Sequence, residues 1–239
     1  MMTDIRKLTD PYERKARLYP ALLCMLPIIV SVSVSFPDIY TMLSGLVALA
    51  VAFGGLHLLS NLARDRGKNL ESKLFEAWGG MPSVSIFRHS DPLIPAPAKL
   101  KYHQFLSDKT GIPAPPLESE VNDSFSADEV YRAWSDYLRS QGRNTVEFPL
   151  LFKENINYGF RRNLLGIRWH CILSSLLAVG LVIAPKFPVF EITEVELTII
   201  VLNAFYLLVL AFVVKRTWVK VMAVEYAKRL VEVIESLRT

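Results

Sequence analysis

Apolar residues along this chain gather into four long blocks separated by polar segments. None of the blocks contains a charged residue, and they cover residues 18–37, 39–63, 169–185 and 197–214. About 20 such residues in a helix cross the ~30 Å hydrocarbon core of a bilayer. An isolated strand there would leave its backbone groups unpaired, so helices are expected throughout. The pattern predicts an all-α membrane protein with four transmembrane helices in two hairpins, at 18–63 and 169–214.

The polar insert between the hairpins, residues 64–168, has the apolar spacing of helices. A four-residue repeat predicts a helix that ends at Gly79–Gly80, because glycine readily adopts the left-handed conformation of a helix C-terminus. Ser126 with Glu129 predicts a capping box for a second helix that reaches about Ser140. The side chains expected on the buried face of that helix are Val130, Tyr131, Trp134, Tyr137 and Leu138.

Charge assigns the two sides of the membrane. Cytosolic segments retain Lys and Arg next to membrane spans. In this chain, basic clusters flank the insert and follow the last apolar block, at Arg64, Arg66, Arg161, Arg162, Arg168, Lys215 and Arg216. The two turns expected outside hold a single basic residue, Lys186. We therefore predict a cytosolic N-terminal tail at 1–17, a cytosolic domain at 64–168 and a cytosolic C-terminal helix at 215–239, with both termini on the same side.

Composition agrees with this arrangement. The 239 residues are 51% hydrophobic and carry a net charge of +4 at pH 7, with a mean hydropathy of +0.29. The two cysteines, Cys24 and Cys171, both lie inside apolar blocks. Burial among apolar groups keeps a thiol inert, so both are expected to be small packing residues.

Polar and small residues inside the predicted spans are candidates for helix interfaces or for a pore lining. Ser31 and Ser35 share one helical face, and Ala48 and Ala52 belong to a stripe of small residues that lets another helix approach closely. Asn203 lies near the middle of the last span, where its amide needs a partner across helices or a water-filled path. No charged residue lies at mid-membrane, which argues against a proton pump and leaves room for a passive pore.

Signatures of catalysis are missing. The chain has no phosphate-binding glycine loop, no HExxH, no CxxC pair and no nucleophile elbow, so no enzyme, cofactor or metal is expected. His89, Asp91 and His103 do not have the spacing of a metal site. A membrane enzyme that uses these three residues on lipid-like substrates remains a minor hypothesis.

Basic and aromatic residues of the insert are candidates for binding an anionic ligand. Arginine grips phosphate, and aromatic faces stack on bases. The candidates are Arg88, His89, Lys153, Tyr158, Arg161 and Arg162. The competing interpretation is that membrane topology alone explains Arg161 and Arg162.

Two blocks of the insert resemble a known family. FEAWGGMPSVSIFRHSD at 75–91 is similar to a WGGxP…RHxD block, and FKENINYGFRRNLLG at 152–166 is similar to an ENxxYGFRRNLLG block. Both occur in small bacterial four-span proteins with a cytosolic insert. That family includes the membrane effectors of Hailong antiphage systems.

The resemblance implies a function that residue patterns do not show. It implies a homo-oligomeric ion channel of the bacterial inner membrane, with a tetramer as a first guess, that acts in antiphage defence. Such a channel is kept closed by single-stranded DNA oligomers that a partner nucleotidyltransferase makes. Arg88, His89, Arg161 and Arg162 would then lie at the DNA-binding surface, with Tyr158 as a base platform. The alternative is a membrane scaffold that recruits a cytosolic partner without conducting ions.

The predicted topology can be tested by labelling intact cells with a membrane-impermeant reagent. Residue 120 and both termini should stay unlabelled until the cells are opened, because basic residues hold these segments in the cytosol. Labelling of residue 120, or of either end, from outside would contradict the topology.

Overall fold

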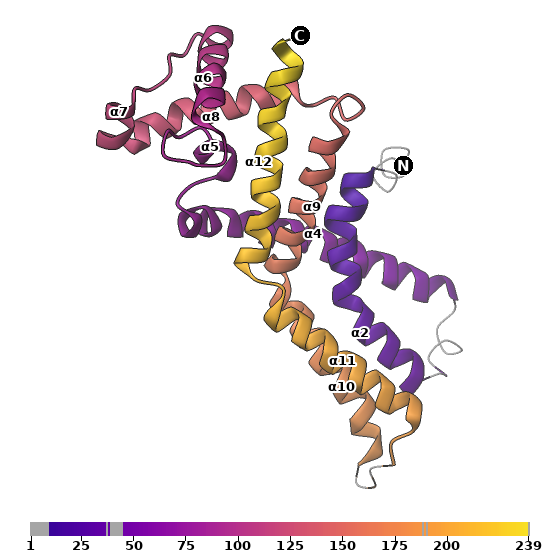
Figure 1. Ribbon diagram of the computed structural model, residues 1–239. Coiled ribbons are helices and arrows are strands. Elements are labelled where there is room, and N and C mark those ends of the chain that lie inside the picture. The colour runs from indigo at the N-terminus through magenta and orange to yellow at the C-terminus, as the bar shows by residue number, and fades with distance from the viewer. Residues whose placement is uncertain (1–9, 37, 39–44, 188, 190, 239) are drawn as a thin grey trace. The chain divides into compact units, whose positions relative to one another are not determined.

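The computed structural model describes residues 10–36, 38, 45–187, 189 and 191–238. In the helix that begins at Gly45, side chains are described from Phe53 onward. The described residues form helices and turns without a strand (Figure 1). The chain divides into two compact units. We call residues 1–71 and 159–219 the apolar unit, and residues 72–158 and 220–239 the polar unit. The all-α expectation is confirmed for the described residues.

The helices of the apolar unit include three that are long and apolar enough to cross a membrane, among the residues that the structure describes. They are η1 with α2 (Glu13–Leu18 and Tyr19–Ser35), α10 with η2 (Arg168–Ile183 and Ala184–Lys186) and α11 (Glu194–Phe212). These correspond to the predicted spans 18–37, 169–185 and 197–214. Only 28%, 28% and 22% of their apolar windows are buried, so the chain itself leaves most of their apolar surface uncovered.

The predicted span 39–63 is only partly described. Residues 39–44, and the side chains of Ala48 and Ala52, lie outside the described residues. From Gly45 onward the segment belongs to α4, a helix of 34 residues that continues to Trp78. In Figure 1, α4 crosses α2 at an angle. The predicted end of this helix is confirmed, since Gly79 and Gly80 follow it with φ of 80° and 135°.

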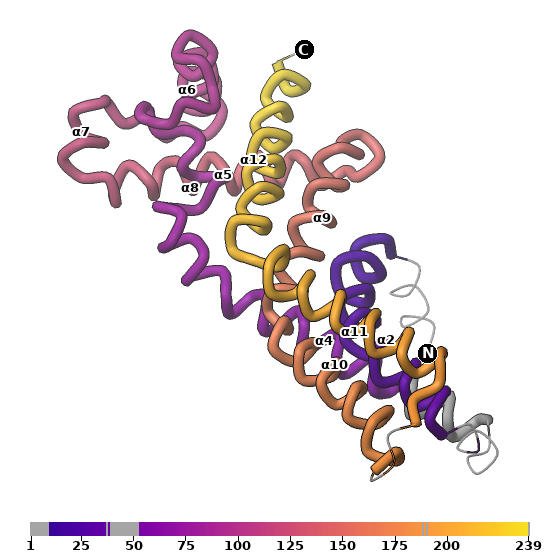
Figure 2. Tube along the Cα trace, turned by 60° about the horizontal axis from the view of Figure 1, so that its bottom comes forward, coloured from indigo at the N-terminus to yellow at the C-terminus, as the bar shows by residue number. Residues whose placement is uncertain are grey.

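Helix α2 is joined to its two neighbours through backbone carbonyls near Pro27. Figures 1 and 2 both show α10 and α11 side by side, and both helices contact α2. Because proline has no N–H, the carbonyl of Leu23 lacks its usual partner in the helix. The Tyr206 hydroxyl of α11 donates to that carbonyl at 2.9 Å. The next carbonyl, of Cys24, accepts from Ser174 Oγ of α10 at 2.5 Å.

Asn203 makes a hydrogen bond across helices, one of the two alternatives that its position left open. Its Oδ1 accepts from Ser175 Oγ of α10 at 2.8 Å, and its Nδ2 donates to the Ile199 carbonyl at 2.9 Å. Both polar ends of the amide are therefore satisfied inside the three-helix group. The hydroxyls of Ser31 and Ser35 are also buried, but they have no hydrogen-bond partner among the described residues.

The two cysteines are buried where α2 meets α10, as free thiols. Their small side chains, together with Ala21 and Ala178, are fully or almost fully buried. Small residues let two helix backbones approach closely, which shortens the distance that Ser174 must span. The packing role expected for Cys24 and Cys171 agrees with this position.

The polar unit has its own hydrophobic core. Its helices are α5 (Pro82–Ser85), α6 (Ala96–Thr110), α7 (Leu117–Asn122), α8 (Ser124–Gln141), the first part of α9 (Pro149–Gly166) and most of α12 (Arg216–Arg238). Tyr131, Trp134 and Leu138 of α8 are fully buried, as predicted, whereas Val130 and Tyr137 are only partly buried. Ala227, Leu230, Val231, Val233 and Ile234 of α12 lie in the same core.

Two features of the polar unit differ from the sequence prediction. Asp123, rather than Ser126, caps α8, because its carboxylate accepts both the backbone N–H and the hydroxyl of Ser126, at 3.1 and 2.6 Å. The C-terminal helix was predicted as a separate segment at 215–239. From Lys220 onward it is instead part of the polar unit, since its apolar face completes the core.

The hydrogen bond from Tyr206 to Leu23 should depend on Pro27. Tyr206→Phe should lower the free energy of unfolding by about 0.6 kcal/mol, and by about 1.7 kcal/mol at most, the average and the maximum found for hydrogen bonds between membrane helices. In a Pro27→Ala background, residue 27 regains an N–H for the Leu23 carbonyl, so the same change should cost less. Unfolding of the detergent-solubilised variants measures both values.

Thr198→Val on α11 is the control for this cycle, because its hydroxyl donates within its own helix, to the Glu194 carbonyl at 2.8 Å. Its effect should be the same in the wild-type and the Pro27→Ala backgrounds. An equal cost of Tyr206→Phe in both backgrounds would show that the missing proline N–H does not matter.

Candidate functional site

The six candidate ligand-binding residues do not form one cluster within one unit. Arg88, His89, Lys153 and Tyr158 belong to the polar unit, and Arg161 and Arg162 belong to the apolar unit. Most of them bind other parts of the protein, in ways that differ between the two units.

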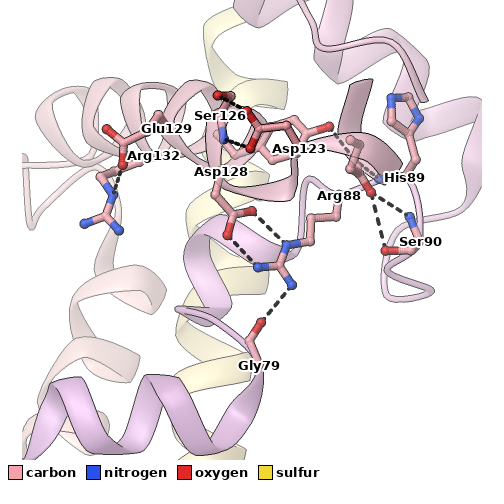
Figure 3. Close-up of polar contacts among 11 residues, drawn as sticks. Gly79, Arg88, His89, Ser90, Asp123, Ser126, Asp128, Glu129 and Arg132 are labelled. Atoms are coloured by element: carbon pink, nitrogen blue, oxygen red, sulfur yellow. Dashed lines mark hydrogen bonds and ion pairs between the residues drawn. The ribbon is translucent and has the colours of Figure 1, made fainter. Parts of the chain in front are cut away.

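Arg88 is held by a carboxylate and a carbonyl (Figure 3). Its Nε and Nη2 donate to the two oxygens of Asp128 at 2.8 and 2.5 Å, and its Nη1 donates to the Gly79 carbonyl at 2.8 Å. These bonds to Asp128 raise the pKa of Arg88. A Cβ on Gly80 would lie 2.8 Å from Arg88 Nη2. The arginine therefore fixes the turn after α4 to the start of α8, and an anionic ligand would have to compete with Asp128 for it.

Glu120 collects the hydrogen bonds of the loop that follows Arg88. It accepts from the His89 N–H at 2.9 Å, from the Tyr131 hydroxyl at 2.7 Å and from the Ser90 N–H and Oγ at 3.4 Å. Burial by itself would raise the pKa of Glu120, but the donors from His89, Tyr131 and Ser90 outweigh burial and lower the pKa below its ordinary value. Burial, followed by the bond to Glu120, raises the pKa of Tyr131.

The two histidines of the polar unit bind backbone carbonyls. His89 Nε2 lies 3.0 Å from the Pro115 carbonyl, and His103 Nε2 lies 2.8 Å from the Phe87 carbonyl. A carbonyl only accepts, so each Nε2 carries the proton. Burial lowers the pKa of His103. The rings meet edge to face with centroids 5.0 Å apart.

Lys99 supports the same loop from α6. Its Nζ donates to the Arg88 carbonyl at 2.6 Å and to the Asp91 carbonyl, and burial lowers its pKa. The Asp91 side chain accepts from the Leu93 N–H at 2.9 Å. No group of three potential metal ligands comes together among the described residues. The RHxD block thus folds as a hydrogen-bonded loop, and the metal and enzyme hypotheses for His89, Asp91 and His103 gain no support from its geometry.

Arg162 is buried in the apolar unit with two partners. Its Nη1 donates to Glu71 Oε1 at 2.5 Å, and its Nε and Nη2 donate to Asn163 Oδ1 at 3.1 and 3.0 Å. Asn163 in turn donates to the Ala16 carbonyl at 2.7 Å. This chain of bonds ties α9 to α4 and to η1. Arg162 is only 6% exposed, so a ligand could not reach its guanidinium without a change in the packing.

Arg161 and Arg168 bind carbonyls at the junction of α11 and α12. Arg161 donates to the Trp218 carbonyl at 2.8 Å, and its guanidinium lies 4.6 Å from the centre of the Trp218 ring. Arg168 donates to the Val214 carbonyl at 3.0 Å. Val214 lies in the interruption between α11 and α12, so its carbonyl has no partner within a helix and Arg168 satisfies it. Trp218 lies in the first turn of α12, and Arg161 ties α9 to that turn.

Three glycines of the apolar unit allow close backbone contacts around these arginines. A Cβ on Gly166 would lie 2.5 Å from the backbone nitrogen of Gly67, and a Cβ on Gly159 would lie 3.0 Å from Ala16 Cβ. The crossing of α4 and α9 therefore requires glycine on both helices. Close packing, rather than ligand binding, thus explains Gly159 and Gly166, the two glycines of the YGFRRNLLG block.

Lys153 and Tyr158 complete the set. Lys153 is exposed on α9, and Tyr158 is half-buried on the same helix.

The partners that sequence reasoning missed are Glu71, Asp128, Glu120 and Trp218. No local pattern identifies them, because they lie far along the chain from the candidate residues that they bind, Arg162, Arg88, His89 and Arg161.

The fold and these contacts define an all-helical protein with three helices able to cross a membrane within its described residues, compatible with a membrane protein. No family model matches the chain, and neither a curated protein nor a solved structure matches it.

The bond between Tyr131 and Glu120 predicts acid sensitivity of the polar unit. Because the folded state lowers the pKa of Glu120, its stabilising effect is complete above pH 4.5, the ordinary value, and is lost as the pH falls through the lower, folded-state pKa. Tyr131→Phe should cost about 1.5–3 kcal/mol at pH 7, as expected for a bond to a charged group. Glu120→Gln should flatten the acid dependence. Thermal unfolding between pH 3 and 7 measures both effects.

Glu118→Gln is the matched control, since Glu118 is exposed on the same helix. It should leave the wild-type acid dependence in place. If Glu120→Gln kept that dependence as well, the hydrogen bonds to Glu120 would not be its source.

Proposed function

We propose that this protein is a homo-oligomeric ion channel of the bacterial inner membrane that acts in antiphage defence. In the proposal, a nucleic-acid or nucleotide ligand, with a single-stranded DNA oligomer as the first candidate, binds the cytosolic domain and controls the pore. In the proposal, the chain crosses the membrane four times, since residues 39–63 form a span in addition to the three apolar helices, and both termini are cytosolic.

The observation that carries the proposal is the exposed apolar surface of the three spans. An apolar helix surface is favourable in lipid or against other apolar helices, but unfavourable in water. The polar groups of the spans that do find partners, such as Asn203 and Tyr206, bind within the three-helix group. Each chain thus supplies a preformed group of helices, and assembly of several copies would place a pore between them.

The structure changes which residues are the best ligand contacts in this proposal. Arg88, Arg161 and Arg162 stabilise the fold through Asp128, Trp218 and Glu71. A loss of binding after their replacement would be ambiguous. Lys153 is exposed, so its replacement should affect ligand binding without unfolding the chain.

A scaffold without conductance is the alternative, and one feature of the polar unit favours it. Leu117 and Val121 of α7 are 57% and 76% exposed, and Phe125 at the start of α8 is 74% exposed. Large exposed apolar side chains that lie together are typical of protein contact surfaces. A partner such as a nucleotidyltransferase could dock there.

The purified protein in a planar bilayer should conduct ions, and a single-stranded DNA oligomer should reduce the current. Binding of the oligomer should weaken linearly on a log–log plot as salt rises, because cations are released from the phosphates. Lys153→Ala should lower the affinity and reduce the salt slope, whereas Lys109→Ala, which removes the same charge from α6, should do neither. Conductance recordings and a fluorescence binding assay measure these effects.

Absence of current with and without DNA would contradict the channel. Equal DNA affinity of the wild type and Lys153→Ala would remove Lys153 from the binding surface. A stable stoichiometric partner combined with no ion flux would favour the scaffold.

A further inference from the structure

A groove lies between η1 and α4, inside the apolar unit. Its volume is about 560 Å³, within the roughly 300–1,000 Å³ of small-molecule sites. One wall comes from η1, and the other comes from one face of α4. The lining residues on η1 are Glu13, Arg14, Arg17 and Leu18, and those on α4 are Phe53, Leu56, His57, Ser60, Asn61 and Arg64.

The groove changes from apolar to basic along α4. Its lining residues there are spaced three or four apart, so they share one helical face. Phe53 and Leu56 come first, uncharged polar side chains follow, and Arg64 comes last. Asn61 Nδ2 lies 3.1 Å from His57 Nε2. Since the amide nitrogen donates, a neutral His57 carries its proton on Nδ1 and offers a further donor.

The charges of the groove favour an anion. Three arginines and one glutamate line it, so it carries two more cations than anions. Glu13 neutralises Arg17, whose Nη1 donates to Glu13 Oε2 at 2.6 Å. Arg14 and Arg64 are exposed and make no ion pair within the described part of the chain. These two guanidinium groups therefore remain available to a phosphate.

The position of the groove along the chain fits the boundary between membrane and water. Arg17 directly precedes the uncharged run from Leu18 to Ser35, which forms the first span. On α4, Arg64 directly follows the apolar block 39–63. Both walls thus change from apolar to basic at the same place, where lipid headgroups meet acyl chains.

We propose that this groove binds one phospholipid with an anionic headgroup. Its phosphate interacts with Arg14 and Arg64, His57 and Asn61 bind the polar groups near the glycerol, and an acyl chain lies along Phe53 and Leu56. A bound lipid of this kind would join η1 to α4 at the membrane surface. The proposal does not depend on ion conduction or on DNA binding.

Native mass spectrometry of the full-length protein in detergent tests the proposal, with phosphatidylglycerol and phosphatidylcholine as probes. The wild type should retain one phosphatidylglycerol per chain in preference to phosphatidylcholine. The double variant Arg14→Gln with Arg64→Gln should lose that preference by roughly tenfold or more, since each basic side chain at the surface contributes to anionic-lipid binding. Arg14→Lys with Arg64→Lys should retain part of it, because the charge remains.

The control variant Lys215→Gln with Arg216→Gln removes two charges beside another span, outside the groove. It should bind phosphatidylglycerol like the wild type. If this control lost phosphatidylglycerol binding as much as Arg14→Gln with Arg64→Gln did, net charge alone would explain the loss, and the proposed site would be wrong. Inorganic phosphate should not displace the lipid. If it did so at millimolar concentration while Phe53→Ser left lipid binding unchanged, the groove would be a simple phosphate site, and the lipid proposal would fail.

Discussion

A carbonyl without a helical partner in the middle of α2 is the constraint on which the apolar unit depends. Pro27 removes one N–H from an apolar helix, and neither water nor lipid can replace it there. The Tyr206 hydroxyl of α11 supplies the missing donor to the Leu23 carbonyl, and Ser174 of α10 donates a further bond to the adjacent Cys24 carbonyl. Hydrophobic attraction between helices is weak in lipid, so these directional bonds and the close packing of small residues give the three helices a defined register. The proline that removes this N–H therefore also determines where a neighbouring helix donates a hydrogen bond.

The polar unit follows the same rule in a different setting. Its loop after α5 carries backbone N–H groups that no helix satisfies, and the Glu120 carboxylate accepts them together with the Tyr131 hydroxyl. Lys99 satisfies carbonyls of the same loop from the other side. Because an unpaired buried polar group is costly, a loop with this many fixed partners has few alternative conformations. The first of the two conspicuous sequence blocks is thus explained by the demands of a compact loop, independently of any ligand.

Features set by local sequence were predictable, and features set by distant partners were not. Span positions follow from uncharged length, the end of α4 follows from Gly79 and Gly80, and the buried face of α8 follows from helical spacing. The cap of α8 was assigned to Ser126 because a serine three residues before a glutamate fits a capping box, yet Asp123 offers a charged acceptor three residues earlier. For Arg162, no periodicity could show that Glu71 lies within hydrogen-bond distance, since the two are 91 residues apart. The candidate ligand site was therefore drawn from residue type alone.

Basic residues beside the apolar helices serve at least two purposes in this chain, and burial separates them. Arg161, Arg162 and Arg168 follow the positive-inside pattern, yet each also binds a carbonyl or a carboxylate of the protein. Side chains used in this way give up hydration only because a fixed partner replaces it. Arg14 and Arg64 satisfy the same topological rule but remain exposed around a groove. The predicted topology concerns where arginines occur along the sequence, whereas the partner of each guanidinium decides whether it stabilises the fold or is available to a ligand.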